Sequence, residues 1–207
     1  ARVLGTHSIT SYIYKEPRPT PQLSFTLREL NAFAGVVITA SHNPKEYNGF
    51  KVYGRDGAQL VPEGVAKINK HMHTVDDIFK IDALSIEELE KQGFVQWILE
   101  EYDEQYLQNL LTLREQNNVS SDINIVYTPL HGSGLYPVVN GLKQFGFQNV
   151  HIVEQQAIQD GTFPTVPYPN PEEPAAFELA MNLGDKISAD LLLATDPDAD
   201  RLGVAVR

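Results

Sequence analysis

The sequence predicts an α/β fold in which layered parallel or mixed sheets are covered by helices. Three observations predict it. Short apolar runs suit buried strands, the stretches between them place apolar residues at helical spacing, and the composition of 42% hydrophobic and 21% charged residues is that of an ordinary globular protein. A chain of 207 residues can bury a core and forms one or two domains.

The first half alternates between strand and helix patterns. Residue alternation and apolar periodicity predict, in order, a strand over 8–14, a helix over 22–33, a buried strand over 35–39, a strand over 49–53 and a helix over 62–74. The acidic stretch 76–93 shows no clear period, so we expect an irregular connection. A long amphipathic helix follows, on which the residues at helical spacing are Tyr102, Tyr106, Leu110 and Leu113.

The second half repeats the theme more clearly. Its short apolar runs, suited to a buried parallel sheet, are 123–127, 150–153 and 191–194. Between the first two, one helix face carries Leu135, Val138, Val139, Leu142 and Phe145. The five prolines of 155–174 predict a surface loop, which leads to a helix over 175–183. Residues 202–206, which Arg207 follows, are predicted to form a further strand.

Charge and composition exclude several classes of function. A formal net charge of -11 argues against nucleic acid, because nucleic-acid binding depends on Lys and Arg that neutralise phosphates. The sequence contains no cysteine, which excludes disulfides and thiol nucleophiles. Its longest apolar runs are too short for a membrane span. We therefore expect a soluble cytoplasmic protein that binds neither nucleic acid nor membrane, and that holds any anion with a local positive site or a metal.

The first concentration of chemistry follows the strand predicted over 35–39. Residues 39–44 read Thr-Ala-Ser-His-Asn-Pro, and 47–51 read Tyr-Asn-Gly-Phe-Lys. A turn set by Asn and Pro exposes the Ser41 hydroxyl at a strand end, where α/β proteins place ligands. The residues alone leave two interpretations: Ser41 carries a transferable group, or it only caps a turn or helix.

The second concentration follows the apolar run 191–194. Residues 195–201 read Thr-Asp-Pro-Asp-Ala-Asp-Arg, and three carboxylates at alternate positions repel one another unless a cation lies among them. Magnesium suits a few carboxylates together with a phosphate oxygen, and calcium is the competitor. The alternative is a solvated acidic loop. The position at the end of an apolar strand, closed by Arg201, favours a metal site formed by Asp196, Asp198 and Asp200.

Taken together, the two motifs resemble those of the α-D-phosphohexomutase superfamily. Residues 39–44 with 48–51 are similar to its phosphoserine loop, and 196–201 are similar to its magnesium loop. Residues 16–21, Glu-Pro-Arg-Pro-Thr-Pro, and 127–134, Tyr-Thr-Pro-Leu-His-Gly-Ser-Gly, add a resemblance to the phosphoglucomutase and phosphomannomutase branch, which includes phosphopentomutase-like members. Because the resemblance covers nearly the whole chain, it removes the interpretation of Ser41 as a simple cap.

The resemblance implies two partial phosphohexomutase-type domains. Residues 1–99 would be the later part of domain I, with the phosphoserine loop and a connecting segment, and 100–207 would be domain II, with the metal loop. The family's sugar-recognition loop and distal phosphate-binding loop have no counterpart in the sequence, and neither does the opening segment of its first domain. We therefore expect a fragment of a longer enzyme, and we expect this fragment alone to be inactive.

The resemblance also implies a reaction. Phosphorylated Ser41 would donate its phosphoryl group to a hexose monophosphate, giving a 1,6-bisphosphate that turns around and returns its other phosphoryl group. The cycle interconverts hexose 1-phosphate and hexose 6-phosphate, with glucose favoured and glucose 1,6-bisphosphate as intermediate and activator. A Mg²⁺ ion would stabilise the transferring charge. Its ligands would be Ser41, as the phosphoserine, with Asp196, Asp198 and Asp200.

Three further residues are implied in catalysis. Arg201 would donate to phosphate oxygens as a planar fork. Lys51 would be the general acid or base, and it needs a cationic neighbourhood or partial desolvation to lose a proton near neutral pH. His42 would orient the serine loop or contact phosphate. Backbone N–H groups near His131 could face an anion or form a plain turn, and Arg18 is interpreted as structural.

Two alternatives belong to other classes. One is a phosphatase of the haloacid dehalogenase type, with Asp196 as nucleophile and Asp198 as acid. It leaves the serine motif unexplained, and its usual Thr or Val two residues after the second Asp is here Asp200. The other is a non-catalytic sugar-phosphate-binding module. Phosphate found on Ser41 rather than Asp196 separates mutase from phosphatase, and turnover of glucose 1-phosphate excludes the non-catalytic module.

Overall fold

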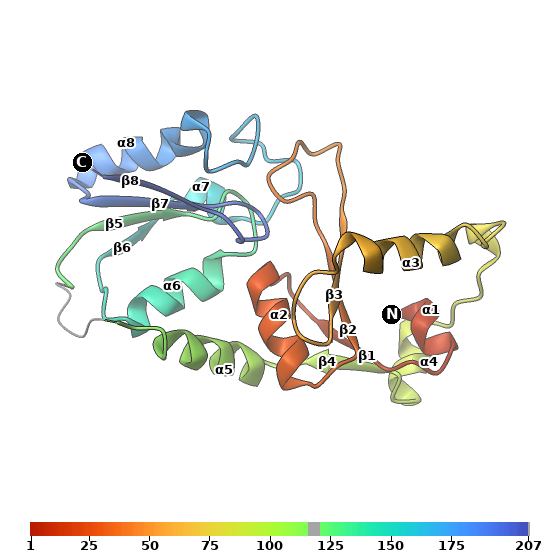
Figure 1. Ribbon diagram of the computed structural model, residues 1–207. Helices are drawn as coiled ribbons and strands as arrows, with labels where there is room; N and C mark the ends of the chain where they lie inside the picture. Colours follow the sequence, from red (N-terminus) through yellow and green to blue (C-terminus); the bar gives the residue numbers. More distant parts are fainter. Residues whose placement is uncertain (116–120, 207) are drawn as a thin grey trace.

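The computed structural model describes residues 1–115 and 121–206 (Figure 1). Strands and helices alternate along these described residues, whose strands form three sheets, two with two strands and one with four. The α/β architecture with layered mixed sheets and covering helices is therefore confirmed. Among the described residues, no helix combines the length and apolar character needed to cross a membrane. The expected division at residue 99 stays a prediction.

The first part of the chain builds the two small sheets. Its strands are β1 (Ser11–Tyr14), β2 (Ala34–Ile38), β3 (Phe50–Gly54) and β4 (Val95–Ile98). Its helices are α1 (Arg2–Thr6), α2 (Thr20–Glu29), α3 (Pro62–Met72), η1 (Ile78–Lys80) and α4 (Ile86–Lys91). β1 pairs with β4 in parallel, and β2 pairs with β3 in antiparallel register. Helix α2 packs against β2 and buries Phe25 and Leu27.

The prediction that the strand over 35–39 is buried is wrong. Exposed and half-buried residues alternate along β2, and Ile38 keeps 68% of its surface exposed. In the structure, β2 has β3 as its pairing partner and α2 against one face, so its other face remains open to solvent. An apolar run of this length does not distinguish a strand covered on both faces from one covered on a single face.

The second part of the chain builds one four-stranded sheet in the order β6-β5-β7-β8. Its strands are β5 (Ile125–Thr128), β6 (Val150–Ile152), β7 (Leu191–Thr195) and β8 (Leu202–Val206). Its helices are α5 (Glu100–Leu111), α6 (Leu135–Gln144), α7 (Glu154–Ala157), η2 (Pro174–Phe177) and α8 (Glu178–Ile187). Ile125 of β5 lies opposite Val150 on one side and Leu191 on the other, both in parallel, whereas β8 is antiparallel to β7.

Helices cover both faces of this sheet (Figure 1). On one face, residues of η2 and α8 pack with Val126 and Ala194 in one buried cluster. On the other face, α6 contributes Val139 to a second cluster with Ile125 and Leu193. Strand β5 is buried along its whole length. This double cover explains why β5 and β7 are continuous apolar runs in the sequence.

Two connections are more ordered than predicted. The stretch 76–93 contains η1 and α4, and α4 begins with a capping box in which Ser85 accepts from the Glu88 amide and Glu88 accepts from the Ser85 amide. The stretch 155–174 buries Gln156, Val166 and Pro169 beneath its surface. Strand β4 was not predicted. These segments obtain their order from contacts with distant elements and from helix caps, which apolar periodicity does not detect.

Candidate active site and metal centre

The serine loop (residues 39–49) connects β2 to β3 and carries Ser41 at a strained position. Ser41 has a φ of 52°, in the left-handed region that non-glycine residues adopt only a few per cent of the time. Its amide donates to Thr39 Oγ1 at 2.7 Å, and the residue is buried. Such a backbone conformation persists where the surroundings fix it, and it recurs at functional sites. The strand end thus turns the Ser41 side chain inward toward the second part of the chain.

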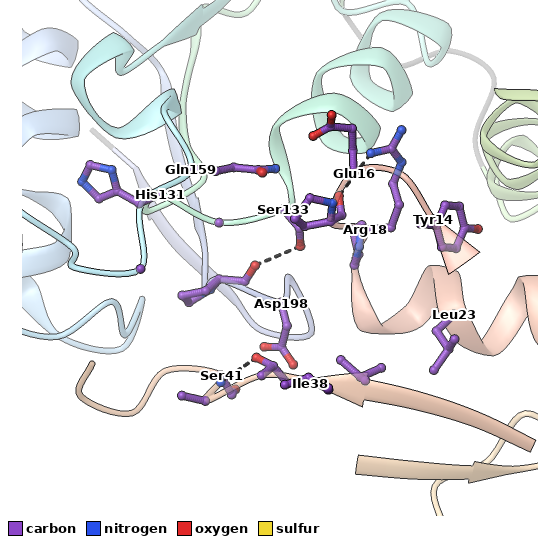
Figure 2. A pocket seen from close by; sticks show the side chains of 18 of the residues that line it. Tyr14, Glu16, Arg18, Leu23, Ile38, Ser41, His131, Ser133, Gln159 and Asp198 are labelled. Atoms are coloured by element: carbon purple, nitrogen blue, oxygen red, sulfur yellow. Dashed lines mark hydrogen bonds between the residues drawn. The ribbon is translucent and has the colours of Figure 1, made fainter. Parts of the chain in front are cut away.

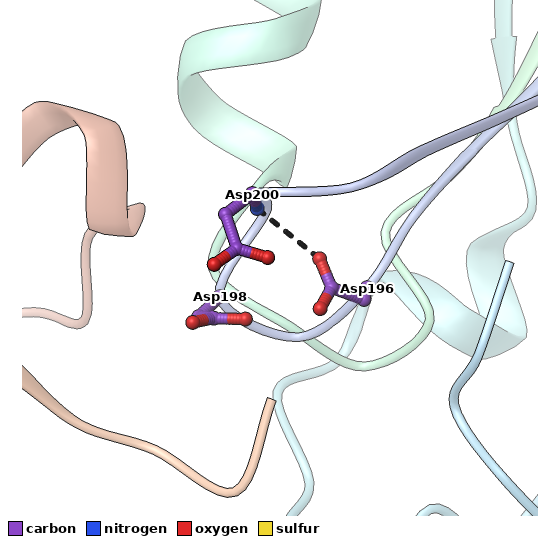
Figure 3. A group of neighbouring side chains, drawn as sticks. All are labelled: Asp196, Asp198 and Asp200. Atoms are coloured by element: carbon purple, nitrogen blue, oxygen red, sulfur yellow. Dashed lines mark hydrogen bonds between the residues drawn. The ribbon is translucent and has the colours of Figure 1, made fainter. Parts of the chain in front are cut away.

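The metal loop (residues 196–201) connects β7 to β8 and wraps around one carboxylate. Asp196 is fully buried, and its Oδ1 accepts from the amides of Asp200 at 3.1 Å and Arg201 at 3.0 Å. Ala199 at the tip has a φ of 49°. As Figure 3 shows, this turn gathers the side chains of Asp196, Asp198 and Asp200, whose candidate ligand oxygens all lie within 4.8 Å of one another.

The two loops meet at their functional side chains. The Ser41 hydroxyl donates to Asp196 Oδ2 at 2.8 Å, although 155 residues separate the two in the sequence. His42 Nδ1 lies 3.3 Å from the Ser41 Oγ. Lys51, near the start of β3, donates to Asp198 Oδ2 at 2.8 Å and to Asp200 Oδ2 at 2.9 Å. The predicted site residues that the structure brings together are Ser41, His42, Lys51, Asp196, Asp198 and Asp200.

Burial and mutual repulsion separate the acidities of two of the carboxyls. Burial, together with the negative charge of Asp198, raises the pKa of Asp196 to about 7, although the Ser41 hydrogen bond acts in the opposite direction. For Asp198, burial alone would raise the pKa, but hydrogen bonds from Lys51 and Thr20 lower it below its ordinary value. Asp198 therefore carries the firmly held negative charge of the pair.

Lys51 sits in an anionic neighbourhood, the opposite of the cationic one that would help it to lose a proton near neutral pH. Burial lowers the pKa of Lys51, but its hydrogen bonds to Asp198 and Asp200 and their negative charges outweigh burial and leave the pKa above its ordinary value. The ammonium group is therefore protonated in this arrangement. As an ammonium group it can donate a proton but cannot accept one, and donation becomes easier only when its bonds to the two carboxylates are weakened.

The carboxylate cluster fits a hard divalent cation. Asp198 Oδ1 is buried and has no hydrogen-bond partner among the described residues, although an unpaired buried carboxylate oxygen is costly. The donors of the cluster are all oxygens, which Mg²⁺ and Ca²⁺ prefer over nitrogen or sulfur. A cation held by Asp196, Asp198 and Asp200 would pair this oxygen and relieve the repulsion that raises the pKa of Asp196.

Arg201 is the predicted site residue whose side chain points elsewhere. Its guanidinium forms an ion pair with Glu172 at 2.6 Å near the surface, so it lies away from Ser41 in this arrangement. Its backbone amide nevertheless helps to fold the metal loop by donating to Asp196 Oδ1. A phosphate-binding role for the Arg201 side chain stays a prediction, and it requires the side chain to leave Glu172.

The turn around His131 packs against the metal loop at Pro197. The Ser133 amide and hydroxyl both donate to the Pro197 carbonyl, at 2.8 and 2.9 Å, and a Cβ atom on Gly132 would overlap the Pro197 backbone. The amides of His131 and Gly132 donate to protein carbonyls, and the His131 ring bonds to Ile158 and Thr165. The turn is therefore a packing element, and the interpretation of its N–H groups as an anion site is not supported.

Two residues of the segment 16–21, Arg18 and Thr20, join the first part of the chain to the second. Thr20, which was not among the predicted site residues, donates its amide to the Asp198 carbonyl and its hydroxyl to Asp198 Oδ2 at 2.8 Å. Arg18 forms a forked ion pair with Asp103, in agreement with the structural role predicted for it. The signal for Thr20 was its place in the segment 16–21, but its partner lies 178 residues away.

The site opens into a cleft of about 760 Å³ between the two parts of the chain. In Figure 2, the lining residues Ser41 and Asp198 lie in the lower half of the view, and His131, Gln159, Ser133 and Arg18 lie above them. The cleft is large enough for a small polar ligand. A ligand in this cleft would lie beside Ser41 and Asp198, which both line it.

Comparisons with known proteins identify the family. The family model for phosphoglucomutase/phosphomannomutase, alpha/beta/alpha domain I, matches residues 1–78, and the model for alpha/beta/alpha domain II matches 101–207. The phosphoglucomutases of Staphylococcus aureus strains N315 and USA300 are each 40% identical to the chain over 213 residues, which covers 100% of the chain and 37% of each relative. The chain therefore spans a little over a third of the length of these relatives.

Solved structures share the fold. A protein of Thermus thermophilus assigned as a phosphomannomutase aligns with a TM-score of 0.79 at 24% identity, over 100% of this chain and 45% of that one. The phosphoglucomutase parafusin of Paramecium aligns with a TM-score of 0.65 at 20% identity, over 95% of this chain and 41% of that one. At these identities the likeness concerns the fold. Together with the family match over both parts, these findings show that the chain belongs to the phosphoglucomutase/phosphomannomutase family of the α-D-phosphohexomutase superfamily.

Proposed function

We propose that this chain carries the phosphoserine and metal-binding machinery of a mutase that interconverts hexose 1-phosphate and hexose 6-phosphate, with glucose as the preferred hexose. The observation that carries the proposal is the hydrogen bond from the Ser41 hydroxyl to Asp196 Oδ2 at 2.8 Å, which joins the serine loop to the metal loop beside the cleft. A nucleophilic hydroxyl beside a cluster of metal-binding carboxylates is the arrangement that phosphoryl transfer requires.

In the proposed reaction, the phosphoryl group moves between oxygens without net hydrolysis. Phosphorylated Ser41 gives its phosphoryl group to a free hydroxyl of the sugar monophosphate. The bond from phosphorus to Ser41 Oγ breaks, a bond to the sugar oxygen forms, the sugar hydroxyl loses its proton, and Oγ gains one. The resulting glucose 1,6-bisphosphate reorients and returns its other phosphoryl group to Ser41. Each half-reaction moves one phosphoryl group from one oxygen to the other and, in net terms, one proton in the opposite direction, so phosphate and protons are both conserved.

The described residues divide the remaining work. We infer that Mg²⁺ is held by Asp196, Asp198 and Asp200 with the Ser41 phosphate, where it would supply charge stabilisation to the transferring group. Lys51, protonated beside Asp198 and Asp200, is the proton donor to the departing oxygen.

Two predicted residues have supporting roles in this proposal. The ring of His42, 3.3 Å from Ser41 Oγ, orients the serine loop. Arg201 binds a phosphate oxygen once its side chain has left Glu172, its partner in the structure. The 3.3 Å contact supports the role proposed for His42, whereas the role proposed for Arg201 needs a side-chain movement.

The geometry disfavours the phosphatase alternative. A nucleophilic Asp196 needs a free carboxylate oxygen that faces the substrate. Here Asp196 is fully buried, its Oδ1 accepts two backbone amides of the metal loop, and its Oδ2 accepts the Ser41 hydroxyl. Ser41 lines the cleft and Asp196 does not. The hydroxyl is thus the group that a phosphorylated ligand would meet.

The test is to map the phosphate. Purified full-length protein is incubated with glucose 1,6-bisphosphate and analysed by intact mass and peptide mapping. We expect one phosphate on Ser41, loss of it in Ser41→Ala, and retention of it in Ser24→Ala, because Ser24 bonds to the Gly57 carbonyl far from the cluster. A phosphate on Asp196, or full mutase activity in Ser41→Ala, would refute the proposal. Measurable conversion of glucose 1-phosphate excludes the non-catalytic module.

A further inference from the structure

A stiff segment in the first part of the chain contacts the second part at two places. Pro17, Pro19 and Pro21 alternate with Arg18 and Thr20, and each proline ring fixes its own φ and restricts the residue before it. Pro19 has φ -56° and ψ 147°, an extended conformation that ends where α2 begins at Thr20. The side chains of Arg18 and Thr20 are therefore held at a fixed separation. We call residues 17–21 the proline strut.

One end of the proline strut is anchored on α5. The Arg18 guanidinium donates to both carboxylate oxygens of Asp103, at 2.8 and 2.7 Å, and Asp103 is only 3% exposed. Gln22 donates a third hydrogen bond to the same carboxylate. The guanidinium also lies 5.8 Å from the ring centre of Tyr14 and 5.4 Å from that of Tyr136 on α6. A forked, partly buried ion pair between two aromatic rings is a strong and directional anchor.

The other end of the proline strut holds a metal-loop carboxylate. Thr20 is 5% exposed, its amide donates to the Asp198 carbonyl at 2.9 Å, and its hydroxyl donates to Asp198 Oδ2 at 2.8 Å. Lys51 donates to the same Oδ2. This oxygen is therefore fully engaged, whereas Oδ1 of the same carboxylate is buried and lacks a hydrogen-bond partner in the part of the chain that the structure describes. Thr20 thus fixes which oxygen of Asp198 stays available.

We propose that the proline strut positions Asp198 as a metal ligand, with Thr20 orienting the carboxylate and the Arg18–Asp103 ion pair holding Thr20 in place. Hydrogen bonds to a ligating carboxylate fix its orientation, and their loss lowers metal affinity without removing a ligand. Arg18 and Thr20 are positioning residues in this proposal. It rests on the metal site of the proposed function and adds a connection from α5 to that site through the first part of the chain.

The first test measures metal binding directly. Mn²⁺ binding to full-length, dephosphorylated protein is followed by EPR of the free ion, with Mg²⁺ as competitor. In Thr20→Val the hydroxyl is lost at nearly constant shape, and we expect the affinity to fall about tenfold. Thr20→Ser keeps the hydroxyl and should bind the ion as the parent does. Thr128→Val is the matched control, because Thr128 is equally buried but donates to Gln156, and it should leave the affinity unchanged.

The second test asks whether the two ends of the proline strut are coupled. Arg18→Gln removes the ion pair to Asp103 and should weaken Mn²⁺ binding several-fold, within the range seen for outer-shell residues. If Arg18 acts through Thr20, then Arg18→Gln should weaken binding much less in the Thr20→Val background than in the parent. Urea unfolding of each variant without metal identifies any protein that is not folded, and Arg18→Lys then serves in place of Arg18→Gln.

The outcomes separate this proposal from the mutase function. An unchanged Mn²⁺ affinity in Thr20→Val, an equal loss in Thr20→Ser, or fully additive effects of the Arg18 and Thr20 variants would each overturn the role of the proline strut. So would a parent protein that binds no Mn²⁺ at all. Because the binding assay uses neither sugar nor phosphoserine, failure of the Ser41 chemistry leaves its result unaffected.

Discussion

The two loops that meet at the site are supported very differently. The metal loop joins β7 and β8 of a four-stranded sheet in which the inner strand β5 is buried throughout. The turn at Gly132 and Ser133 supports this loop. The serine loop joins β2 and β3, a two-stranded pair with one face open to solvent. A two-stranded sheet is marginal by itself. The metal loop is therefore the template. The serine loop is positioned against it by the Ser41 hydrogen bond to Asp196 and, in the adjoining strand β3, by the contacts of Lys51 with Asp198 and Asp200.

The largest expected effect comes from separating the two parts. Residues 100–206 contain the four-stranded sheet and the buried clusters on both of its faces, so we expect this piece to fold and unfold cooperatively. Residues 1–99 should not do so, because their strands form separate pairs. Urea unfolding monitored by circular dichroism measures both. Cooperative unfolding of 1–99 alone would show that the serine loop has a scaffold of its own.

The next effect tests the support beneath the metal loop. A Cβ atom on Gly132 would overlap the backbone of Pro197, which cannot move without distorting the loop. We expect Gly132→Ala to lower the free energy of unfolding by about 3 kcal/mol. Gly141→Ala is the control. Gly141 lies within α6, where alanine is favoured, and its Cβ would meet Leu107 of α5 at an ordinary 3.8 Å. Equal stability of the two variants would show that the turn does not support the metal loop.

A smaller effect measures the coupling between the loops. Phosphate on Ser41 adds roughly two negative charges and a ligand oxygen beside the carboxylates, so phosphorylated protein should bind Mg²⁺ about tenfold more tightly. Titration calorimetry on both forms of the full-length protein measures the ratio. Asp198→Asn should weaken binding in both forms. Equal affinity of the phosphorylated and dephosphorylated forms would mean that the two loops act independently.

The smallest expected effect comes from the helix cap of α4 in the first part of the chain. The Ser85 hydroxyl accepts from the Glu88 amide at the start of α4, so Ser85→Ala should lower the free energy of unfolding by about 1 kcal/mol. Thr112→Ala removes a hydroxyl that donates to a carbonyl at the end of α5, and it should cost less than half as much. Thermal unfolding of the two variants provides the comparison. The reverse order would contradict the capping role of Ser85.

The sequence predicted the second part better than the first, for a physical reason. Strands β5 and β7 are covered on both faces, so each is a continuous apolar run. Strand β4 has only four residues, two of them exposed, and it pairs with β1 across more than eighty residues, so no local pattern marks it. Helix α4 carried a local signal, the Ser85 and Glu88 capping box, which apolar periodicity overlooks.

The same distinction holds at the site. Ser41 and the three aspartates stand out because each motif is compact in the sequence, and resemblance to a family joined the two. The role of Thr20 could not be predicted, since it depends on a contact with Asp198, 178 residues away. The direction of the Arg201 side chain was also beyond prediction, because Glu172 competes for it. Local motifs specify which groups are present, whereas folding decides which of them touch.

The hydrogen bond from Ser41 to Asp196 depends on whether Ser41 is phosphorylated. The hydroxyl can donate to Asp196 Oδ2 only while Oγ carries a hydrogen, so phosphorylation removes the contact that holds the serine loop in the structure described. It also adds negative charge beside a buried carboxylate. The dephosphorylated loop is thus held by its own hydroxyl, whereas the phosphorylated loop depends on a cation. Depletion of divalent metal would accordingly loosen the serine loop of the phosphorylated protein and leave that of the dephosphorylated protein in place.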